Sequence, residues 1–449
     1  SQQIQDQIDR LFSSILLEQR KINEVRPPDP EKAPLSEELI QQFTEIRGRD
    51  FIYPYLSSGR GHGPFSELVD GSVKYDMIGG IGPGLLGHSH PLHIKANLEA
   101  ATMDQVMCGN LMPYPDAFSL SQRLLESVKG SHLKHFWFAG SGSFANDNAL
   151  KMIWQKKGPK HKIIAFEKAF AGRSVATQDI TFNPHHRQGM PRNIEVDYVP
   201  HYDQNQPDKA LEKTLLALEN IWSDQGENYA ALMIELVQGE AGILYGTPEY
   251  YKGIFEWAKS KGLYIWVDEI QTFGRTRQLF AFQHFGLDEY VDVVTVGKAL
   301  QACGTLYTAE LNPEPGLIAG TFNGSLAALK AGEKSLRYLT EGPFYGEGGR
   351  SHQLESLFLT KLYRLAQDSC QGRLHSIRGL GTMLAFEVGE GDKKTCKKFL
   401  HRLFKNGVIA FSAGQHPTRV RFLFPLSLTE EHIEEIVKRI EKSVLETFS

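Results

Sequence analysis

The chain has 449 residues, of which 49 are Lys or Arg and 53 are Asp or Glu, so its formal charge is 49 − 53 = −4. This slightly acidic balance excludes a general electrostatic attraction to nucleic acid or to an anionic membrane surface. Hydrophobic residues make up 41% of the chain and charged residues 23%, proportions typical of a folded globular protein. At about 150 residues per domain, the length allows about three domains.

The cysteines are few and widely spaced: Cys108, Cys303, Cys370 and Cys396. They have neither the density of a disulfide framework nor the spacing of a zinc site, which favours a reducing compartment. No apolar run approaches the roughly 18 residues of a membrane span, and the N-terminus lacks the layout of a signal peptide. We therefore expect a cytoplasmic protein with no metal, no membrane association and no nucleic-acid partner.

In the first segment, apolar residues recur at three- and four-residue steps: Ile4, Ile8, Leu11 and Ile15. This spacing predicts an amphipathic helix within residues 1–25. Prolines in residues 26–30 end it and predict a linker. Short strand-like pieces separated by glycines follow in residues 51–87. We assign residues 1–79 to an N-terminal segment whose strands join the smaller lobe.

From about residue 135 short apolar runs recur, at 135–139, 162–166, 231–237, 264–267, 291–296 and 305–309. Helical stretches such as 146–157 and 249–261 separate most of them. Strands that alternate with helices predict a parallel α/β sheet buried on both faces. We assign residues 80–334 to a large domain built on this mainly parallel sheet.

The last part of the chain mixes short strands around Leu384 and Val420 with longer helical stretches, at 354–367, 393–405 and 430–446. This mixture predicts a smaller α+β domain over residues 335–449.

A first glycine motif, Gly-Pro-Gly-Leu-Leu-Gly at 82–87, fits G-x-G-x-x-G and would indicate a nicotinamide-dependent dehydrogenase. Proline fills its second position, and no second strand ends in an acid about 20 residues later to bind the ribose. The dehydrogenase is therefore a distant alternative. His88 and His90 follow the motif, but without a third ligand they do not predict a metal site.

A second glycine loop, Gly-Ser-Gly-Ser at 140–143, directly follows the strand at 135–139 and precedes the helix at 146–157. At such a junction backbone amides and hydroxyls converge on an anion at the positive end of the helix. The loop is a candidate phosphate cradle; a tight turn that simply needs glycine is the alternative.

Asp268 and Glu269 end the apolar strand at 264–267, and Gly297-Lys298 follows the strand at 291–296. Ligands of open α/β sheets bind at the carboxyl ends of the strands, so Asp268 and Lys298 are candidates for one site. An Asp-Glu pair also often caps a helix. Together with a phosphate cradle, a lysine and a carboxylate suggest a phosphorylated pyridine aldehyde linked to the lysine.

Several segments resemble the class III pyridoxal-phosphate-dependent aminotransferases of fold type I, in that family's order and spacing: 141–143, 170–173, 235–240, 268–276 and 296–298. The resemblance runs from about residue 51 to the C-terminus. It implies the aspartate-aminotransferase-like α/β fold, with a large mainly parallel-sheet domain and a smaller α+β domain. It also implies the cofactor pyridoxal 5'-phosphate and a homodimer whose site is shared across the interface.

By this resemblance, Lys298 forms the internal aldimine and then shuttles the proton, for which it must lose its own charge. Asp268 holds the pyridine nitrogen protonated, and Gln271 contacts the phenolic oxygen. The other implied cofactor contacts are Ser141, Gly142 and Ser143 on the phosphate, Phe170 and Ile270 on the two ring faces, and Thr321 from the neighbouring subunit.

The resemblance also implies Arg421 for the substrate α-carboxylate, Arg173 for a distal carboxylate, and Glu240 as the partner that masks Arg421. This set favours transfer of the ω-amino group of 4-aminobutyrate, lysine, ornithine or acetylornithine to 2-oxoglutarate, giving a semialdehyde and glutamate. A racemase or aminomutase on the same fold is the main alternative, and a cofactor-binding protein without activity is disfavoured because Lys298 and Asp268 are both present.

The sequence departs from the family pattern near the expected substrate side. Phe144 stands where glutamate or a small residue is common, Ala171 replaces a frequent histidine, and Leu236 replaces a proline. The loop at 272–274 is one glycine shorter than the common form. These departures leave the reaction type intact and the donor and acceptor open.

Overall fold

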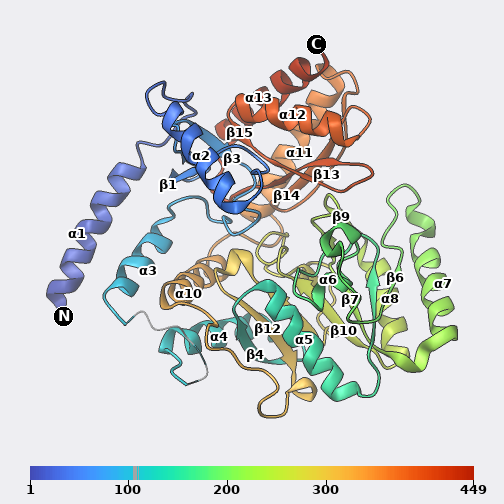
Figure 1. Ribbon diagram of the computed structural model, residues 1–449. Helices are drawn as coiled ribbons and strands as arrows, with labels where there is room; N and C mark the ends of the chain where they lie inside the picture. Colours follow the sequence, from blue (N-terminus) through green and yellow to red (C-terminus); the bar gives the residue numbers. More distant parts are fainter. Residues whose placement is uncertain (105–108, 110) are drawn as a thin grey trace. The chain divides into compact units, whose positions relative to one another are not determined.

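The computed structural model describes residues 1–104, 109 and 111–449, so Cys108 lies outside the described residues. The chain forms two compact units, one of Ser1–Glu99 with Gln353–Ser449 and the other of Ala100–His352 (Figure 1). In the part of the chain that is described, no helix has the length and apolar character of a membrane span. The domain boundaries at 79/80 and 334/335 stay a prediction, which limited proteolysis would test.

A seven-stranded sheet with the order β4-β12-β11-β10-β7-β5-β6 forms the centre of the Ala100–His352 unit. Its strands are β4 (Leu133–Ala139), β5 (Lys162–Phe166), β6 (Val196–Val199), β7 (Tyr229–Ile234), β10 (Tyr264–Glu269), β11 (Val293–Val296) and β12 (Cys303–Thr308). Strands β6, β5, β7, β10 and β11 pair in parallel. The predicted strand-helix alternation is present over this part of the sheet.

Strand β12 departs from the parallel expectation, because it pairs antiparallel with both β11 and β4. The reason is the length of its connection: only residues 297–302 separate β11 from β12. A parallel crossover needs about a dozen residues or more, so the chain must turn back beside β11. The prediction of parallel pairing is therefore wrong for the strand at 305–309.

Two further strand predictions differ from the structure. The run at 231–237 is not one strand, because β7 ends at Ile234 and a separate hairpin of β8 (Val237–Gln238) and β9 (Leu244–Tyr245) follows. The edge strand β6 was not predicted, since its four residues include the polar Asp197 and give no apolar run.

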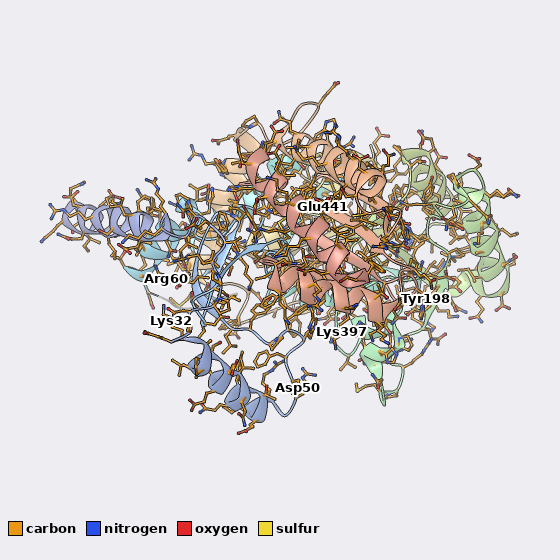
Figure 2. All side chains as sticks on the ribbon, turned by 90° about the horizontal axis from the view of Figure 1, so that it is seen from above. Lys32, Asp50, Arg60, Tyr198, Lys397 and Glu441 are labelled. Carbon is orange, nitrogen blue, oxygen red and sulfur yellow. The ribbon has the colours of Figure 1, made fainter. Side chains whose placement is uncertain are left out.

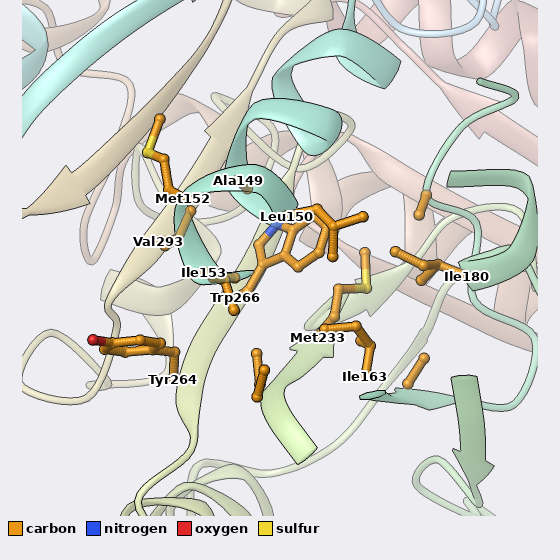
Figure 3. Packing of buried hydrophobic residues seen from close by; sticks show 14 of the residues in the cluster. Ala149, Leu150, Met152, Ile153, Ile163, Ile180, Met233, Tyr264, Trp266 and Val293 are labelled. Carbon is orange, nitrogen blue, oxygen red and sulfur yellow. The ribbon is translucent and has the colours of Figure 1, made fainter. Parts of the chain in front are cut away.

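Helix α5 (Gly142–Lys157) packs against this sheet with Ala149, Ile153 and their neighbours, around the fully buried Trp266 of β10 (Figure 3). Its N-cap is Ser141, whose hydroxyl accepts from the backbone N–H of Phe144 at 3.3 Å. The other helices of this unit are α4 (Pro115–Ser127), α6 (Thr177–Ile180), α7 (Pro207–Gln225), α8 (Pro248–Ser260), α9 (Ala281–His284) and α10 (Leu326–Glu341). Helices α3 (Pro91–Ala101) and α11 (Arg350–Asp368) contain the two junctions between the units.

The other unit contains two small sheets. One has the order β1-β2-β3-β15 and the other β13-β14-β17-β16. The strands are β1 (Ser57–His62), β2 (Phe65–Leu68), β3 (Val73–Asp76), β13 (Leu374–Leu380), β14 (Met383–Val388), β15 (Val408–Ile409), β16 (Phe411–Ala413) and β17 (Arg419–Leu423). Because β3 pairs with β15, N-terminal and C-terminal segments share one sheet.

The helices of this unit are α1 (Gln2–Gln19), α2 (Ala33–Arg47), α12 (Lys393–Lys405) and α13 (Glu430–Phe448), together with most of α11. Helix α12 has the bounds that its sequence predicts, with the exposed Lys397 on its polar face (Figure 2). The glycine motif at residues 82–87 follows β3, whose partners are β2 and β15 of the small sheet. The motif therefore does not open a βαβ unit. This topology excludes the dinucleotide interpretation of that motif.

Candidate active site

A pocket of about 230 Å³ opens at the carboxyl ends of β10 and β11, beside the N-terminus of α5. It lies entirely within the Ala100–His352 unit. Its lining combines hydroxyls, carboxylates and one lysine: Ser141, Gly142, Ser143, Asn146, Phe170, Ala171, Gly172, Glu235, Glu240, Asp268, Ile270, Gln271, Lys298 and Cys303. Most of the residues predicted from the sequence for the cofactor are therefore neighbours in space.

The predicted phosphate cradle is the first turn of α5. The hydroxyl of Ser143 accepts from the backbone N–H of Arg173 at 3.1 Å, which ties the cradle to the loop after β5. A Cβ at Gly142 would lie 3.0 Å from Cγ2 of Ile270, so a larger residue there would press against that side chain. Backbone amides at a helix N-terminus bind anions, and the cradle interpretation is therefore preferred over a bare turn.

Asp268 is the central carboxylate of the pocket. Its Oδ1 accepts from the backbone N–H of Ile270 at 2.9 Å, and its Oδ2 accepts from Nδ2 of Asn146 at 2.7 Å. Burial raises the pKa of Asp268 to about 6, although both donors and the nearby Lys298 act in the opposite direction. A carboxylate with these partners remains ionised at neutral pH.

Sequence reasoning missed Asn146. Its amide lies between Asp268 and Thr295, which face each other in register on β10 and β11. A signal was available: Asn146 shares one face of α5 with Ala149, Leu150 and Ile153, all at most 1% exposed. A polar residue on an otherwise apolar helix face must find buried partners.

Lys298 follows β11 at the start of a short 3-10 turn, with a left-handed backbone φ of 46°. This unusual conformation for a residue other than glycine marks a strained position, as is common at functional sites. The Lys298 backbone N–H donates to the thiol of Cys303, whose pKa burial raises. Cys303 and the described cysteines of the other unit, Cys370 and Cys396, are free thiols, as expected.

Phe170 and Gln271 are held by different means. The backbone N–H of Phe170 donates to Oε1 of Glu235 at 2.7 Å, and burial raises the pKa of Glu235 well above its usual value. Gln271 packs against Gly239 so closely that a Cβ there would lie 1.7 Å from its Oε1. Glycine is thus required at position 239 for Gln271 to reach the pocket.

The adjacent carboxylates of the Asp-Glu pair have separate tasks. Glu269 is absent from the pocket lining and accepts from the backbone N–H groups of Ala281 at 3.0 Å and Phe282 at 2.9 Å, and from the Thr272 hydroxyl. Burial raises its pKa to about 7. The helix-cap interpretation therefore holds for Glu269, whereas Asp268 belongs to the pocket.

The remaining predicted residues are more dispersed. Glu240 lines the pocket, and Arg173 lies exposed just after Gly172. Thr321 is exposed and does not line the pocket. Arg421 lies on β17 in the other unit, fully buried, with its guanidinium 5.9 Å from the ring centroid of Phe411. The roles of these residues stay predictions.

Comparison with known proteins agrees with this geometry. The profile described as aminotransferase class-III matches residues 50–444. Acetylornithine aminotransferase 1 from Bradyrhizobium diazoefficiens is 30% identical over 403 residues, covering 86% of this chain and 92% of its own length. A probable 4-aminobutyrate aminotransferase from Bacillus subtilis is 29% identical over 406 residues, covering 85% of this chain and 91% of its own.

Among solved structures, lysine aminotransferase from M. tuberculosis in the internal aldimine form superposes with a TM-score of 0.81 at 21% identity, covering 91% of this chain and 99% of its own. The chain therefore belongs to the class III aminotransferase family and has its fold. It is a pyridoxal-phosphate-dependent aminotransferase that works on an amino donor and a 2-oxo acid acceptor. The fold class, family and cofactor predicted from the sequence are confirmed.

The residues of the pocket are suited to pyridoxal phosphate. A helix N-terminus with hydroxyl neighbours is suited to a phosphate, and a buried carboxylate is suited to a protonated ring nitrogen. Among the residues that the structure describes, Lys298 is the one lysine in the pocket lining, and it lies two residues after the end of β11. All three features converge on one cavity of about 230 Å³.

Proposed function

We propose that this aminotransferase moves the ω-amino group of an ω-amino acid or basic amino acid to 2-oxoglutarate, producing a semialdehyde and glutamate. The observation that carries the proposal is the pocket that brings Lys298, Asp268 and Glu240 together. Relatives named as acetylornithine and 4-aminobutyrate aminotransferases support the donor class. No feature favours a racemase or aminomutase over transfer.

Pyridoxal phosphate, when bound, supplies an electron sink for negative charge at the carbon that bears the transferred amine. Asp268 keeps the pyridine nitrogen protonated through a charge-assisted hydrogen bond. Lys298 would hold the cofactor in the resting enzyme and, with substrate bound, would take up and return the proton at its Nζ atom. Proton uptake requires an Nζ amine without charge, because an ammonium group cannot accept a proton.

The other contacts are assigned to holding and orienting the cofactor and the substrate. We assign the phosphate to Ser141, Gly142 and Ser143, and the two ring faces to Phe170 and Ile270. Gln271 donates to the phenolic oxygen. Arg421 and Arg173 are assigned to the substrate carboxylates, because a guanidinium binds a carboxylate through two parallel hydrogen bonds. Glu240, in the pocket, provides the negative charge that lets one site accept an ω-amine and a dicarboxylate in turn.

The test is a panel of amino donors with the cofactor-loaded enzyme. We expect 4-aminobutyrate, ornithine, acetylornithine or lysine to bleach the visible cofactor absorbance and to yield glutamate from 2-oxoglutarate, with pyruvate as the comparison acceptor. Racemisation without glutamate formation would contradict transfer, and consumption of only α-amino donors would contradict the ω-donor assignment.

The functional enzyme is proposed to be a homodimer in which Thr321 of each subunit reaches the phosphate of the other. Exposed apolar side chains support this: Leu111 is 94% exposed, Phe118 71% and Phe322, next to Thr321, 67%. A groove of about 560 Å³ lined by Phe118, Trp137 and Asn323 adjoins them. Apolar exposure of this extent is typical of an interface.

Analytical ultracentrifugation tests the dimer, and Phe118→Glu with Phe322→Glu is expected to give a monomer that no longer retains the cofactor. A wild-type monomer with full activity would contradict the shared site. The cytoplasmic location remains a prediction from the scattered cysteines.

A further inference from the structure

A buried relay of side chains connects α5 to the strands that carry the cofactor carboxylate. Thr295 Oγ1 donates to Asn146 Oδ1 at 2.7 Å, and Asn146 Nδ2 donates to Asp268 Oδ2 at 2.7 Å. Thr295 is 0% exposed, Asn146 1% and Asp268 5%. We propose that Asn146, oriented by Thr295, is the positioning residue that keeps the Asp268 carboxylate in the orientation and charge state that the cofactor nitrogen requires. This inference rests on the role proposed above for Asp268.

The amide of Asn146 has one acceptable orientation. Its Nδ2 faces two acceptors, Asp268 Oδ2 and the backbone carbonyl of Ala171, each at 2.7 Å. Its Oδ1 faces the donor Thr295 Oγ1. Reversing the amide would place its carbonyl oxygen against two acceptors, so the surrounding groups determine which end meets Asp268. The Thr295 hydroxyl also lies near Asp268, where its hydrogen bond favours the ionised carboxylate.

Both oxygens of Asp268 are engaged, one by Asn146 and the other by the backbone N–H of Ile270. The Asn146 donor matters because several neighbouring groups disfavour the negative charge of the Asp268 carboxylate. Glu235, Glu269 and the Cys303 thiol interact unfavourably with its charge. Lys298 acts favourably. A neutral donor that favours the ionised form offsets part of the cost of burial.

Helix α5 therefore has two tasks. Its N-terminus provides the phosphate cradle, and Asn146, three residues after Ser143, contacts the carboxylate. At 1.5 Å per residue the rise between them is about 4.5 Å, within a single rigid helix. Thr305 also ties α5 to the sheet, by donating from Oγ1 to the backbone carbonyl of Ala145 at 2.8 Å. One element thus determines the separation between cradle and carboxylate.

The experiment compares Thr295→Val with the matched control Thr305→Val. Both threonines are fully buried and bond to adjacent residues of α5, but only Thr295 contacts Asn146. We expect Thr295→Val to weaken binding of pyridoxal phosphate to the apoprotein about tenfold, by absorbance titration, as for the loss of one hydrogen bond to a charged network. Thr305→Val should change it less than about twofold, and Thr295→Ser should restore binding. Equal losses in both valine variants would overturn the proposal.

A second measurement needs no cofactor, so it separates failure of this inference from failure of the proposed function. The melting temperature of the apoprotein is recorded from pH 5 to pH 8. Native Asp268 binds a proton more readily than the unfolded chain, so its contribution to stability is lost as pH rises through about 6. Asn146→Ala should make this loss steeper than in wild type. Adding Asp268→Asn to both proteins should remove the difference between their pH profiles. Parallel pH profiles of Asn146→Ala and wild type would overturn the proposal.

Discussion

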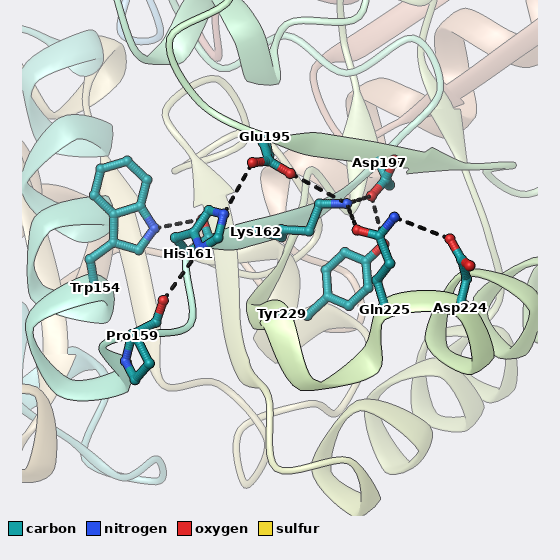
Figure 4. A network of polar contacts seen from close by, with 9 residues as sticks. All are labelled: Trp154, Pro159, His161, Lys162, Glu195, Asp197, Asp224, Gln225 and Tyr229. Atoms are coloured by element: carbon teal, nitrogen blue, oxygen red, sulfur yellow. Dashed lines mark hydrogen bonds and ion pairs between the residues drawn. The ribbon is translucent and has the colours of Figure 1, made fainter.

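Two polar networks lie at opposite ends of the same sheet, and they differ in how completely they exclude water. At the carboxyl ends of β10 and β11, Asp268, Asn146 and Thr295 are almost fully buried. At the amino ends of β5, β6 and β7, Lys162 contacts Asp197, Gln225 and Glu195 (Figure 4). The first network contains the carboxylate proposed to hold the cofactor nitrogen; the second consists of ion pairs and hydrogen bonds at a sheet edge.

The difference shows in the electrostatics of the two aspartates. Burial raises the pKa of Asp268 to about 6. Burial also acts to raise the pKa of Asp197, but hydrogen bonds from Tyr229 and Lys162 outweigh it and lower that pKa below its usual value. The side chain of Glu195 is 61% exposed, so water screens its charge. Burial of Asp268 is thus only partly compensated, as is common for carboxylates at functional sites, whereas the charge of Asp197 is fully compensated by its partners.

The largest effect is expected at Lys298. Lys298→Ala removes the amine that moves the proton, so kcat should fall by about 10³-fold or more while the fold persists. Steady-state kinetics and circular dichroism measure the two quantities. An alanine variant with turnover near wild type would remove the basis of the proposed mechanism.

Asp268→Asn is expected to come second, with kcat lowered about 10²- to 10³-fold, because a neutral amide of the same shape no longer keeps the ring nitrogen protonated. Unlike a general packing defect, the substitution should leave the melting temperature of the apoprotein at pH 8 unchanged or higher, since it removes a buried charge. Loss of both activity and stability would indicate a structural role instead.

Lys162→Met tests the other network. The Nζ atom of Lys162 donates to Asp197 at 2.9 Å and to Gln225 at 2.5 Å, from a side chain only 8% exposed. Its loss should reduce the free energy of unfolding by about 1–3 kcal/mol without changing kcat. Urea denaturation measures the free energy of unfolding and donor kinetics measure kcat, both on one preparation. A kcat change with unchanged stability would break the contrast between the networks.

The two networks should respond to pH in opposite directions. Stability linked to Asp268 is lost as pH rises through about 6, because its pKa is raised in the native state. Stability linked to Asp197 is lost as pH falls below its usual range, because its pKa is lowered. Melting curves of Asp268→Asn and Asp197→Asn against wild type, from pH 3 to pH 8, should therefore diverge at opposite ends of the range. Divergence at the same end of the pH range would show that the direction of one of the two pKa shifts is wrong.

The smallest effect is expected for Glu195→Gln. The Glu195 carboxylate lies 3.6 Å from Lys162 and 3.2 Å from His161, and water screens exposed pairs of this kind so that they contribute little to stability. The midpoint of urea denaturation should stay close to that of wild type, with kcat unchanged. A loss as large as that of Lys162→Met would mean that Glu195, despite its exposure, is part of the stabilising network.

Much of this architecture could be predicted from local sequence. The strand at 162–166 and the helix at 393–405 have the predicted bounds, since apolar runs and helical periodicity determine them locally. The direction of β12 could not be predicted in that way, because it depends on a short connection and on its pairing with β4, far away in the sequence. Edge strand β6 was missed because its pattern is too short and too polar.

The same division holds for the site. Chain order and spacing alone determined the motifs of the aminotransferase family, including the lysine after β11 and the carboxylate at the end of β10, because these groups follow the strands that position them. The tertiary structure decided which acid of the Asp-Glu pair enters the pocket and which caps α9. It also decided that Asn146 and Thr295 join Asp268, since residues so far apart in sequence meet only when α5 packs on the sheet.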